Sequence, residues 1–374
     1  MSPRFRCASF DESADGYVRA EGVGCFLLKP LRRAQQDGDA IHGVILAHGE
    51  NHGGRANSLT APNPAAQAAL LTRVYSPGLA AQVSYVETHG TGTLLGDPIE
   101  IDALKAAWRE LCPNQPEQSV WLGAVKSNIG HLEPAAGAAS LAKVLLAMQH
   151  STLTANHHFR RLNPLINLEQ SPFSILTQTR PWPSPQVAGI SSFGFGGANA
   201  HLVVGQAPRR EQCANLHACY LVTMSAASDK ALQAMREQLK DFLTHALQTG
   251  PSRLDLEQVA YTCNSGRAQA EFRLAWVASS LADLVQQLAL PSTSWRAVAQ
   301  SNGDAATSLR ADLPRHEALS VLRECFLQGE TLDWASVHRG ESGQRVHLPT
   351  YRFDERDYWF DQIRPNRTAQ ESAR

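Results

Sequence analysis

Short apolar runs that end in polar, glycine-containing loops recur along the first 207 residues, with amphipathic stretches between some of them. The apolar runs predict β-strands at Val23–Lys29, His42–Ala47, Val83–Val86, Ser119–Val125 and His201–Val204. Strands that alternate with helices predict an α/β fold with a buried sheet. In such folds the functional loops often lie at the carboxyl ends of the strands.

A polar stretch that contains a proline, Gln206–Gln212, predicts a domain boundary. The pattern beyond it predicts a small α/β unit of two strands and several helices. The strands are expected at Tyr220–Met224 and Arg273–Val277, and the other segments are Asp229–Leu247, Leu254–Tyr261, Leu281–Leu288 and Glu317–Leu327. Residues 291–310 are polar with little periodicity, which indicates a loop.

Composition narrows the class of protein. The 374 residues carry 34 Lys+Arg against 35 Asp+Glu, and this balance argues against general nucleic-acid binding. The run Leu141–Met148 is too short to span a bilayer, and no signal peptide follows Met1, so we expect a cytoplasmic protein. The seven cysteines are scattered without a C-x-x-C pair, which argues against disulfides and against a zinc or other metal site.

The loop after Val86 carries the first candidate chemistry. His89 follows a buried strand among glycine and hydroxyl residues, which leave room for a substrate, although a lone histidine there is more often structural. Asp97 is expected to cap a helix that has Glu100 three residues later. Helix initiation and a catalytic part remain equal alternatives for these two carboxylates. The apolar stripe of that helix is Ile101, Leu104 and Trp108.

A second loop, Val125–Gly137, contains Lys126 at the expected end of a strand and His131 just before a helix opened by Glu133. Positive potential at a helix N-terminus favours a neutral imidazole, which can act as a hydrogen-bond donor or base near pH 7. Only six of the 34 basic residues are lysines, so a lysine between a strand and a glycine loop is not routine surface charge. A buried Lys126 paired with a carboxylate such as Glu100 is the structural interpretation, and it is compatible with a catalytic role.

A third loop, within Gly189–Val204, is rich in glycine. It fails the dinucleotide-binding pattern because Asn199 stands where the third glycine is needed and because a strand, not a helix, follows. A better interpretation is a loop of exposed backbone N–H groups that stabilises an oxyanion, with Phe193 and Phe195 as apolar walls.

Together, the segments H-G-T-G-T, K-S-N-I-G-H and G-F-G-G-A-N-A-H resemble the ketosynthase domains of modular type I polyketide synthases, which have a thiolase-like fold. Phe10–Gly22 also matches, and Asn51–Pro64 resembles ketosynthases whose acyltransferase is a separate protein. The resemblance implies the C-terminal part of the ketosynthase core at 1–207, a flanking α/β subdomain at 208–310, a closing segment at 311–362 that packs back on the core, and a tail at 363–374.

The resemblance also implies roles for single residues. His89 and His131 match the two family histidines, and Lys126 matches the lysine that supports their electrostatics with Glu100 and Asp97. The threonines that bind phosphopantetheine correspond to Thr91 and Thr93, and the gating phenylalanine with its oxyanion N–H corresponds to Phe195 beside Phe193. No cofactor is expected to bind directly. The expected partners are an acyl carrier protein that delivers phosphopantetheine, neighbouring modules or the remaining half, and a second copy in a complete ketosynthase.

The family nucleophile is a cysteine in an Ala-Cys-Ser-Ser-type turn upstream of the segments found here, and no cysteine of this chain has that context. Cys7 matches a non-catalytic position, and Cys25 is expected in a core strand. We therefore expect an acyltransferase-class condensing enzyme only when a Cys-bearing half complements the chain. The alternatives are a non-catalytic remnant that docks or scaffolds a synthase, and an unrelated α/β binding protein or hydrolase, which no G-x-S-x-G motif supports.

Overall fold

The computed structural model describes residues 1–55, 62–208, 216–249, 254–291, 295–296 and 307–355. The chain forms two compact units. The first contains Met1–Leu31 and Ile41–Arg209, and the second contains Arg32–Ala40 and Arg210–Arg374. Each unit has its own sheet and its own buried clusters.

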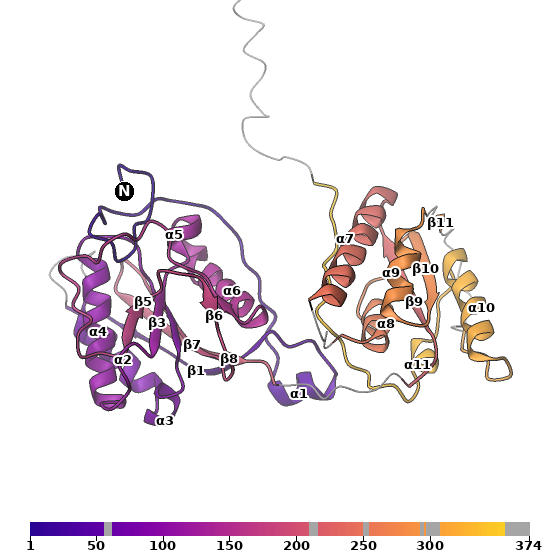
Figure 1. The fold of residues 1–374 in the computed structure, drawn as a ribbon, viewed down its shortest axis with the longest axis horizontal. Helices are drawn as coiled ribbons and strands as arrows, with labels where there is room; N and C mark the ends of the chain where they lie inside the picture. The colour runs from indigo at the N-terminus through magenta and orange to yellow at the C-terminus, as the bar shows by residue number, and fades with distance from the viewer. Residues whose placement is uncertain (56–61, 209–215, 250–253, 292–294, 297–306, 356–374) are drawn as a thin grey trace, which may run out of the picture. The chain divides into compact units, whose positions relative to one another are not determined.

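The first unit is built on a six-stranded mixed sheet (Figure 1). In spatial order its strands are β1 (Gly43–His52), β8 (Ala198–Gln206), β7 (Val187–Phe193), β2 (Tyr85–Glu87), β3 (Val120–Gly123) and β5 (Phe173–Ile175). The strands β7, β2, β3 and β5 run parallel, whereas β1, β8 and β7 pair antiparallel. A separate two-stranded ribbon joins β4 (Thr152–Leu153) to β6 (Arg180–Pro181).

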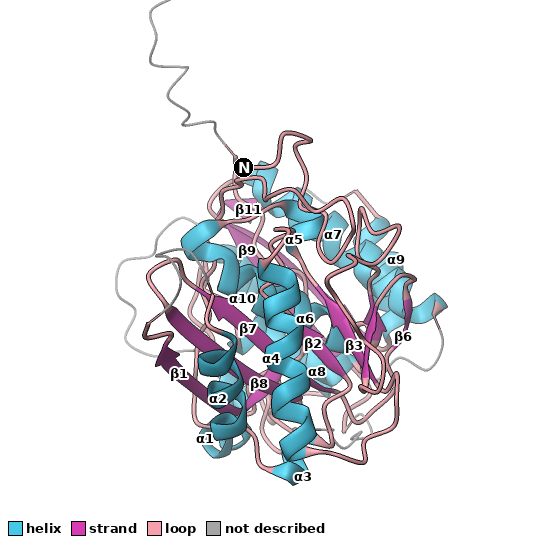
Figure 2. Cartoon of the chain, turned by 90° about the vertical axis from the view of Figure 1, so that its left-hand side faces the viewer, coloured by secondary structure: helices cyan, strands magenta, loops and turns pink. Residues whose placement is uncertain are grey.

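Helices cover both faces of this sheet. Figures 1 and 2 show α2 (Pro64–Val74) and α4 (Gly96–Leu111) on one face, while α6 (Ala136–Gln149) lies on the other. Successive side chains of a strand point to opposite faces, so Val86 joins the cluster under α4 and Tyr85 joins the one with α6. The remaining short helices are α3 (Pro77–Ala80), α5 (Lys126–Ile129) and the 3₁₀ turn η1 (Glu133–Ala135). The predicted α/β class is confirmed.

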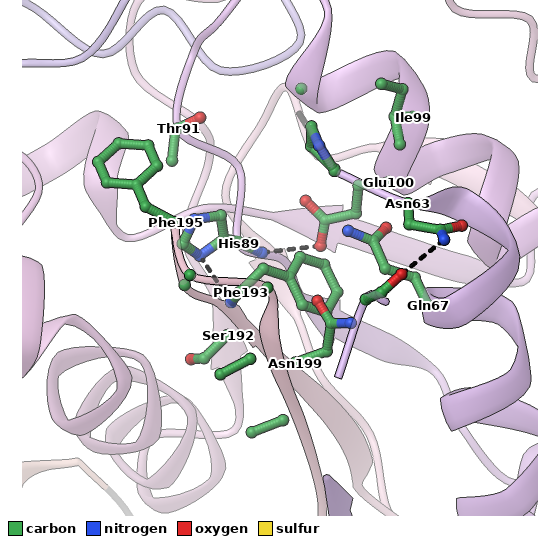
Figure 3. Close-up of a pocket in the computed structure, with 18 of the residues that line it drawn as sticks. Asn63, Gln67, His89, Thr91, Ile99, Glu100, Ser192, Phe193, Phe195 and Asn199 are labelled. Atoms are coloured by element: carbon green, nitrogen blue, oxygen red, sulfur yellow. Dashed lines mark hydrogen bonds between the residues drawn. The ribbon is translucent and has the colours of Figure 1, made fainter. Parts of the chain in front are cut away.

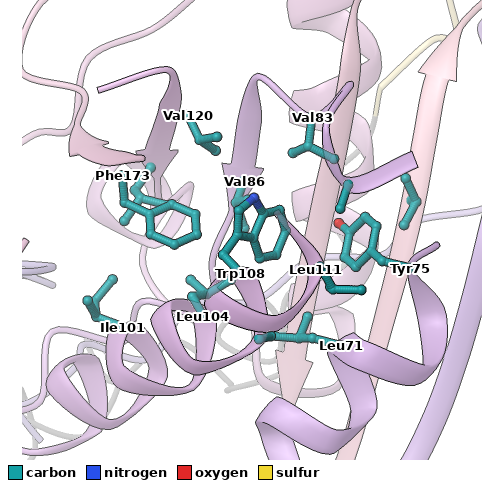
Figure 4. Packing of buried hydrophobic residues seen from close by; sticks show 14 of the residues in the cluster. Leu71, Tyr75, Val83, Val86, Ile101, Leu104, Trp108, Leu111, Val120 and Phe173 are labelled. Atoms are coloured by element: carbon teal, nitrogen blue, oxygen red, sulfur yellow. The ribbon is translucent and has the colours of Figure 1, made fainter. Parts of the chain in front are cut away.

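The predicted apolar stripe of α4 forms the centre of the larger core (Figure 4). Ile101, Leu104 and Trp108 are at most 1% exposed. The Trp108 ring meets Tyr75 and Phe173 edge-on, with ring centroids 5.1 and 5.3 Å apart. Such aromatic pairs add about 0.5–1.5 kcal/mol beyond burial, so this helix is fixed firmly against the strands that carry the site.

A buried histidine ties the sheet to α2. His201 of β8 lies 2.8 Å from the Tyr75 hydroxyl through Nε2 and 3.0 Å from Ser191 Oγ through Nδ1. Burial lowers the pKa of His201 to about 3. An unfolded histidine binds its proton near pH 6.5, so the unfolded state holds more protons between pH 6.5 and 3, and stability falls as the pH falls.

We expect His201→Gln to remove part of this acid sensitivity. The wild type should lose about 3 kcal/mol of unfolding free energy between pH 6.5 and 4 through this one group, and the variant should lose correspondingly less. Urea unfolding at both pH values measures the difference, with the exposed His150→Gln as control. Equal acid sensitivity in wild type and H201Q would contradict the assignment.

The second unit has a three-stranded sheet in the order β11 (Trp295–Arg296), β10 (Phe272–Ala278) and β9 (Tyr220–Ala226). One face packs against α7 (Asp229–Gln248), α8 (Leu256–Ser265) and α9 (Leu281–Ala289), and the other packs against α10 (Arg315–Gln328). A short helix, α11 (Trp334–Val337), follows. The two predicted strands and the predicted helices agree with the structure to within a few residues, whereas β11 lies in the stretch 291–310 that was predicted to be a loop.

The helix α1 (Leu31–Gln36) begins the short segment that belongs to the second unit. Arg345 donates its backbone N–H to the Gly38 carbonyl at 2.8 Å and pairs with Asp39 at 3.1 Å. Gly38 itself has φ +63°, and an added Cβ would lie 2.0 Å from the Gly343 carbonyl oxygen. The close approach of these two backbones explains why a glycine stands there.

One predicted strand is wrong. Val23–Lys29 pairs with none of the described strands, and its side chains are exposed, with Val23 at 99% and Leu27 at 95%. Cys25 is exposed as well, so its predicted core position is also wrong. An apolar run predicts that a segment is buried, but it does not show which residues cover the segment. The described residues of this unit do not cover Val23–Lys29.

Several predictions fall partly outside the described residues. These are most of the boundary stretch, most of the 291–310 loop, the end of the closing segment and the tail, all within residues 209–215, 292–294, 297–306 and 356–374. Within the described residues, no helix is both long enough and apolar enough to cross a membrane.

Candidate active site

The three loops singled out by the sequence meet at one open cavity of about 1780 Å³ in the first unit (Figure 3). Its lining includes His89, His131, Phe193 and Phe195. Thr91, Thr93, Asp97 and Glu100 line it as well. Because β2 and β3 are parallel neighbours, the loops that follow them emerge at the same edge of the sheet, which brings the two histidines together.

The two imidazoles form the centre of the site. Their ring centroids are 5.6 Å apart, and the planes are nearly perpendicular at 83°. The Phe193 backbone N–H donates to Nδ1 of His89 at 3.3 Å, and the Glu133 N–H donates to Nδ1 of His131 at 2.9 Å. A nitrogen that accepts a hydrogen bond carries no proton, so both neutral rings hold their proton on Nε2.

The surroundings keep both rings neutral. Burial, together with Lys126 and the neighbouring ring, lowers the pKa of His89 well below its usual value. Burial and Lys126 lower the pKa of His131 to about 4, against the opposing effect of Glu133. The neutral imidazole expected from the sequence thus has burial as its main cause. Two neutral rings can each offer one N–H to a shared acceptor.

The two carboxylates hold the loop around His89. Glu100 accepts the backbone N–H groups of His89 and Gly90 at 2.8 and 3.0 Å. Asp97 was expected to cap the helix, which is wrong: α4 begins at Gly96 with no side-chain cap, and Asp97 instead accepts from Gly92 and Phe10. Burial raises the pKa of Asp97 to about 6 and that of Glu100 to about 7.

Lys126 is buried at 2% exposure and is not part of the cavity lining. It opens the short helix α5, whereas the sequence predicted the end of a strand there. Burial lowers its pKa, and the carboxylate that opposes this most is Glu87, ahead of the predicted Glu100. Sequence patterns did not single out Glu87 because it is the last residue of an otherwise apolar strand.

The loop Gly90–Thr93 is shaped by left-handed backbone at both of its glycines, with φ of +42° at Gly90 and +75° at Gly92. It presents Thr91 and Thr93, whose hydroxyl oxygens are 3.3 Å apart, to the cavity. Ser9 donates its hydroxyl to the Gly90 carbonyl at 2.7 Å and fixes the loop from the other side.

The glycine loop opposite the histidines is shorter than the sequence indicated. Val187–Phe193 is a strand, β7, so only Gly194–Gly197 forms the turn of the β7–β8 hairpin. Phe193 lies 5.6 Å from the His89 ring between centroids, and Phe195 is 62% exposed. Among the described residues, no hydrogen bond is formed by the Phe195 N–H.

One aromatic residue of the site was not predicted. Tyr17 lines the cavity, with its ring centroid 5.0 Å from that of His131 and 6.4 Å from that of Phe195. It lies in the matched segment Phe10–Gly22, but nothing in its local pattern marks it. The described lining contains no cysteine, and no described group of His, Cys, Asp and Glu side chains could hold a metal ion.

Known family models match three segments of the chain. The family described as "Beta-ketoacyl synthase, C-terminal domain" matches residues 42–160, and "Ketoacyl-synthetase C-terminal extension" matches 163–265. "Beta-ketoacyl synthase, N-terminal domain" matches residues 1–34. The chain belongs to the β-ketoacyl synthase family. The predicted family is therefore confirmed.

Curated relatives place the chain among the ketosynthases of polyketide synthases. Polyketide synthase PksN of Bacillus subtilis is 36% identical over 100% of this chain and 7% of its own length. Polyketide synthase ThaG of Burkholderia thailandensis is 40% identical over 96% of the chain and 7% of its own length. The chain thus spans a small fraction of these relatives.

Solved structures confirm the thiolase-like fold. The ketosynthase from module 6 of the bacillaene synthase from Bacillus subtilis 168 is 34% identical, with a TM-score of 0.80 over 96% of this chain and 65% of that one. The oxazolomycin ketosynthase domain OzmH KS7 from Streptomyces albus is 33% identical, with a TM-score of 0.77 over 93% and 59%. This ketosynthase chain spans less than two thirds of either structure.

Proposed function

We propose that this chain supplies the two-histidine half of a site for decarboxylative Claisen condensation between carrier-protein-bound acyl and malonyl thioesters. The observation that carries the proposal is the pair of neutral rings, His89 and His131, edge to face beside a cavity with both protons on Nε2. Both N–H groups can donate to one thioester carbonyl oxygen of the malonyl unit.

These hydrogen bonds would stabilise the negative charge that develops on the thioester oxygen during decarboxylation. The malonyl carboxylate leaves as CO₂, and the electron pair of the broken carbon–carbon bond forms an enolate whose oxygen accepts from Nε2 of both rings. The enolate carbon then attacks the carbonyl carbon of the acyl thioester, and the thiolate leaves. The oxyanion formed during that attack can accept from the Phe195 N–H, which no described group occupies.

Thr91 and Thr93 are the groups we expect to meet the arm that carries the malonyl unit. Their hydroxyls lie on the same loop as His89 and line the same cavity. Hydroxyls both donate and accept, which suits the amides of phosphopantetheine. An acyl carrier protein would therefore be the partner that delivers the arm, and no other cofactor is needed for the reaction.

We propose that the acyl-bearing thiol comes from outside these residues. The two cysteines of the N-terminal segment are unsuitable nucleophiles. Burial raises the pKa of the Cys7 thiol. Cys25 is exposed and is not among the residues that line the cavity. A raised pKa leaves the thiol protonated and poorly nucleophilic.

Acylation experiments test whether the acyl-bearing cysteine comes from outside this chain. The chain alone, incubated with a radiolabelled acyl-carrier thioester, should remain unlabelled. The chain joined to a Cys-bearing ketosynthase N-terminal half should be acylated stoichiometrically and should elongate the acyl group when malonyl-carrier protein is added. Stoichiometric cysteine labelling of the chain alone would contradict the proposal, and so would a complemented protein that is acylated but never elongates.

A further inference from the structure

The first unit contains a largely buried ion pair, Glu87 with Lys143, that no part of the condensation described above uses. Glu87, the last residue of β2, is fully buried, and its Oε2 lies 2.9 Å from Nζ of Lys143 on α6. The Lys143 side chain is 12% exposed. An ion pair taken out of water is costly, and one that persists needs further hydrogen bonds to compensate.

Both oxygens of Glu87 make those further bonds. Tyr85 donates its hydroxyl to Oε2 at 2.6 Å, and the Val125 backbone N–H donates to Oε1 at 2.5 Å. Burial and the negative charge of Glu87 raise the pKa of Tyr85 well above its usual value, so Tyr85 remains a neutral donor. Contacts with Tyr85, Val125 and Lys143 therefore fix the orientation of the Glu87 carboxylate.

These contacts reach both ends of the loop that carries His131. Val125 immediately precedes Lys126 and the short helix α5, whereas Lys143 lies on α6, which follows His131 and η1. One carboxylate thus connects the strand before His89, the start of the His131 loop and the helix after it. Glu87 thus holds the start of that loop directly, and it holds the helix that follows the loop through Lys143.

We propose that Glu87 and Lys143 are a positioning pair that holds the loop from Val125 to His131, and with it Lys126, in the geometry that the condensation requires. The proposal rests on the proposed function, and it adds two residues that touch neither the cavity nor a reacting atom. Displacement of a reacting group by about 1 Å can cost about a hundredfold in rate, so the effect of the pair should appear in kcat.

Glu87 also affects the charge of the site through Lys126, because its negative charge raises the pKa of Lys126 against the effect of burial. The groups around His131 are Lys126, Glu133, the ring of Tyr17 and the ring of His89. Glu133 is paired with the exposed Arg19 at 2.8 Å. Loss of Glu87 alone would leave the buried Lys126 and the mostly buried Lys143 with less compensation. Loss of Lys143 alone would leave excess negative charge, so the two single variants should disturb the site in opposite senses.

The test uses the complete ketosynthase that contains this chain, with variants Glu87→Gln, Lys143→Met and the double variant. Each single variant should lower kcat for malonyl decarboxylation about 10- to 100-fold with KM within about twofold, because the loop shifts while the cavity stays. The double variant should recover to within about tenfold of wild type, since removal of both charges leaves neither one unpaired. Lys105→Met is the matched control, because Lys105 is also buried but donates to the Asn167 carbonyl.

Two further measurements keep the outcome decisive. If a single variant does not fold, Glu87→Asp and Lys143→Arg retain the charges, and Glu87→Asp should still lose activity because the shorter side chain cannot reach both Val125 and Lys143.

If the wild type does not elongate, the proposed function fails, and ¹⁵N-histidine spectra of the chain then test the pair alone. The His131 signals should move in both single variants and return in the double variant. Wild-type kcat in both single variants, a double variant no better than either single one, or unmoved His131 signals would overturn the proposal.

Discussion

Replacement of His131 by alanine is expected to lower malonyl decarboxylation by the complete ketosynthase about 10²- to 10³-fold. Removal of one preorganised oxyanion donor has a cost of this size in other enzymes. The structure supplies the reason for preorganisation here, since the Glu133 N–H fixes Nδ1 as the acceptor and burial keeps the ring neutral. The loss should fall on kcat, because the donated bond strengthens only as charge develops.

The control for His131→Ala is His150→Ala. His150 is exposed at the end of α6, on the helix that follows His131, so its loss tests the effect of removing any histidine nearby. A melting temperature close to wild type in both variants separates catalysis from folding. His131→Ala activity within threefold of wild type would contradict the assigned role, whatever the control shows.

The two histidines could be predicted from sequence because each lies in a dense local motif. His89 and His131 follow adjacent parallel strands, and their surrounding glycine and hydroxyl residues are confined to segments a few residues long. The loops of neighbouring parallel strands meet at one sheet edge, so the three-dimensional site follows from the order of the motifs.

The residues that support the site could not be predicted in the same way. Glu87 and Lys143 are 56 positions apart and each looks ordinary in its own element, so only the packing of α6 on the sheet reveals the pair. Asp97 has the sequence of a helix cap, yet its carboxylate bonds the backbone of Gly92 and of Phe10, which lies 87 residues away. Long-range hydrogen bonds override local propensity at both places.

The error at Val23–Lys29 has a different origin. The run is apolar enough for a core strand, but a strand also needs a neighbour to complete its backbone hydrogen bonds, and none of the described strands pairs with it. Apolar character and strand pairing are separate requirements, and a single sequence reports only the first.

Gly92→Ala is expected to destabilise the protein by about 2–5 kcal/mol. Gly92 has φ +75°, and an alanine in left-handed backbone costs about 1–2 kcal/mol. Its Cβ would also lie 2.8 Å from the Ala8 backbone nitrogen, and backbone atoms cannot move aside as the end of a side chain can. Overpacking of this kind adds about 1–3 kcal/mol.

Gly54→Ala separates the two contributions to that loss. Gly54 has a similar φ of +63°, but none of the described atoms lies within 4 Å of an added Cβ, so this variant should lose only the backbone share of about 1–2 kcal/mol. Chemical denaturation of both variants gives the comparison. Equal losses would mean that the loop and Ala8 can separate without cost. A larger loss at Gly92 means that the backbone at Ala8 cannot move away from the turn that carries Thr91 and Thr93. The contact with Ala8 then fixes the position of these two threonines in the cavity.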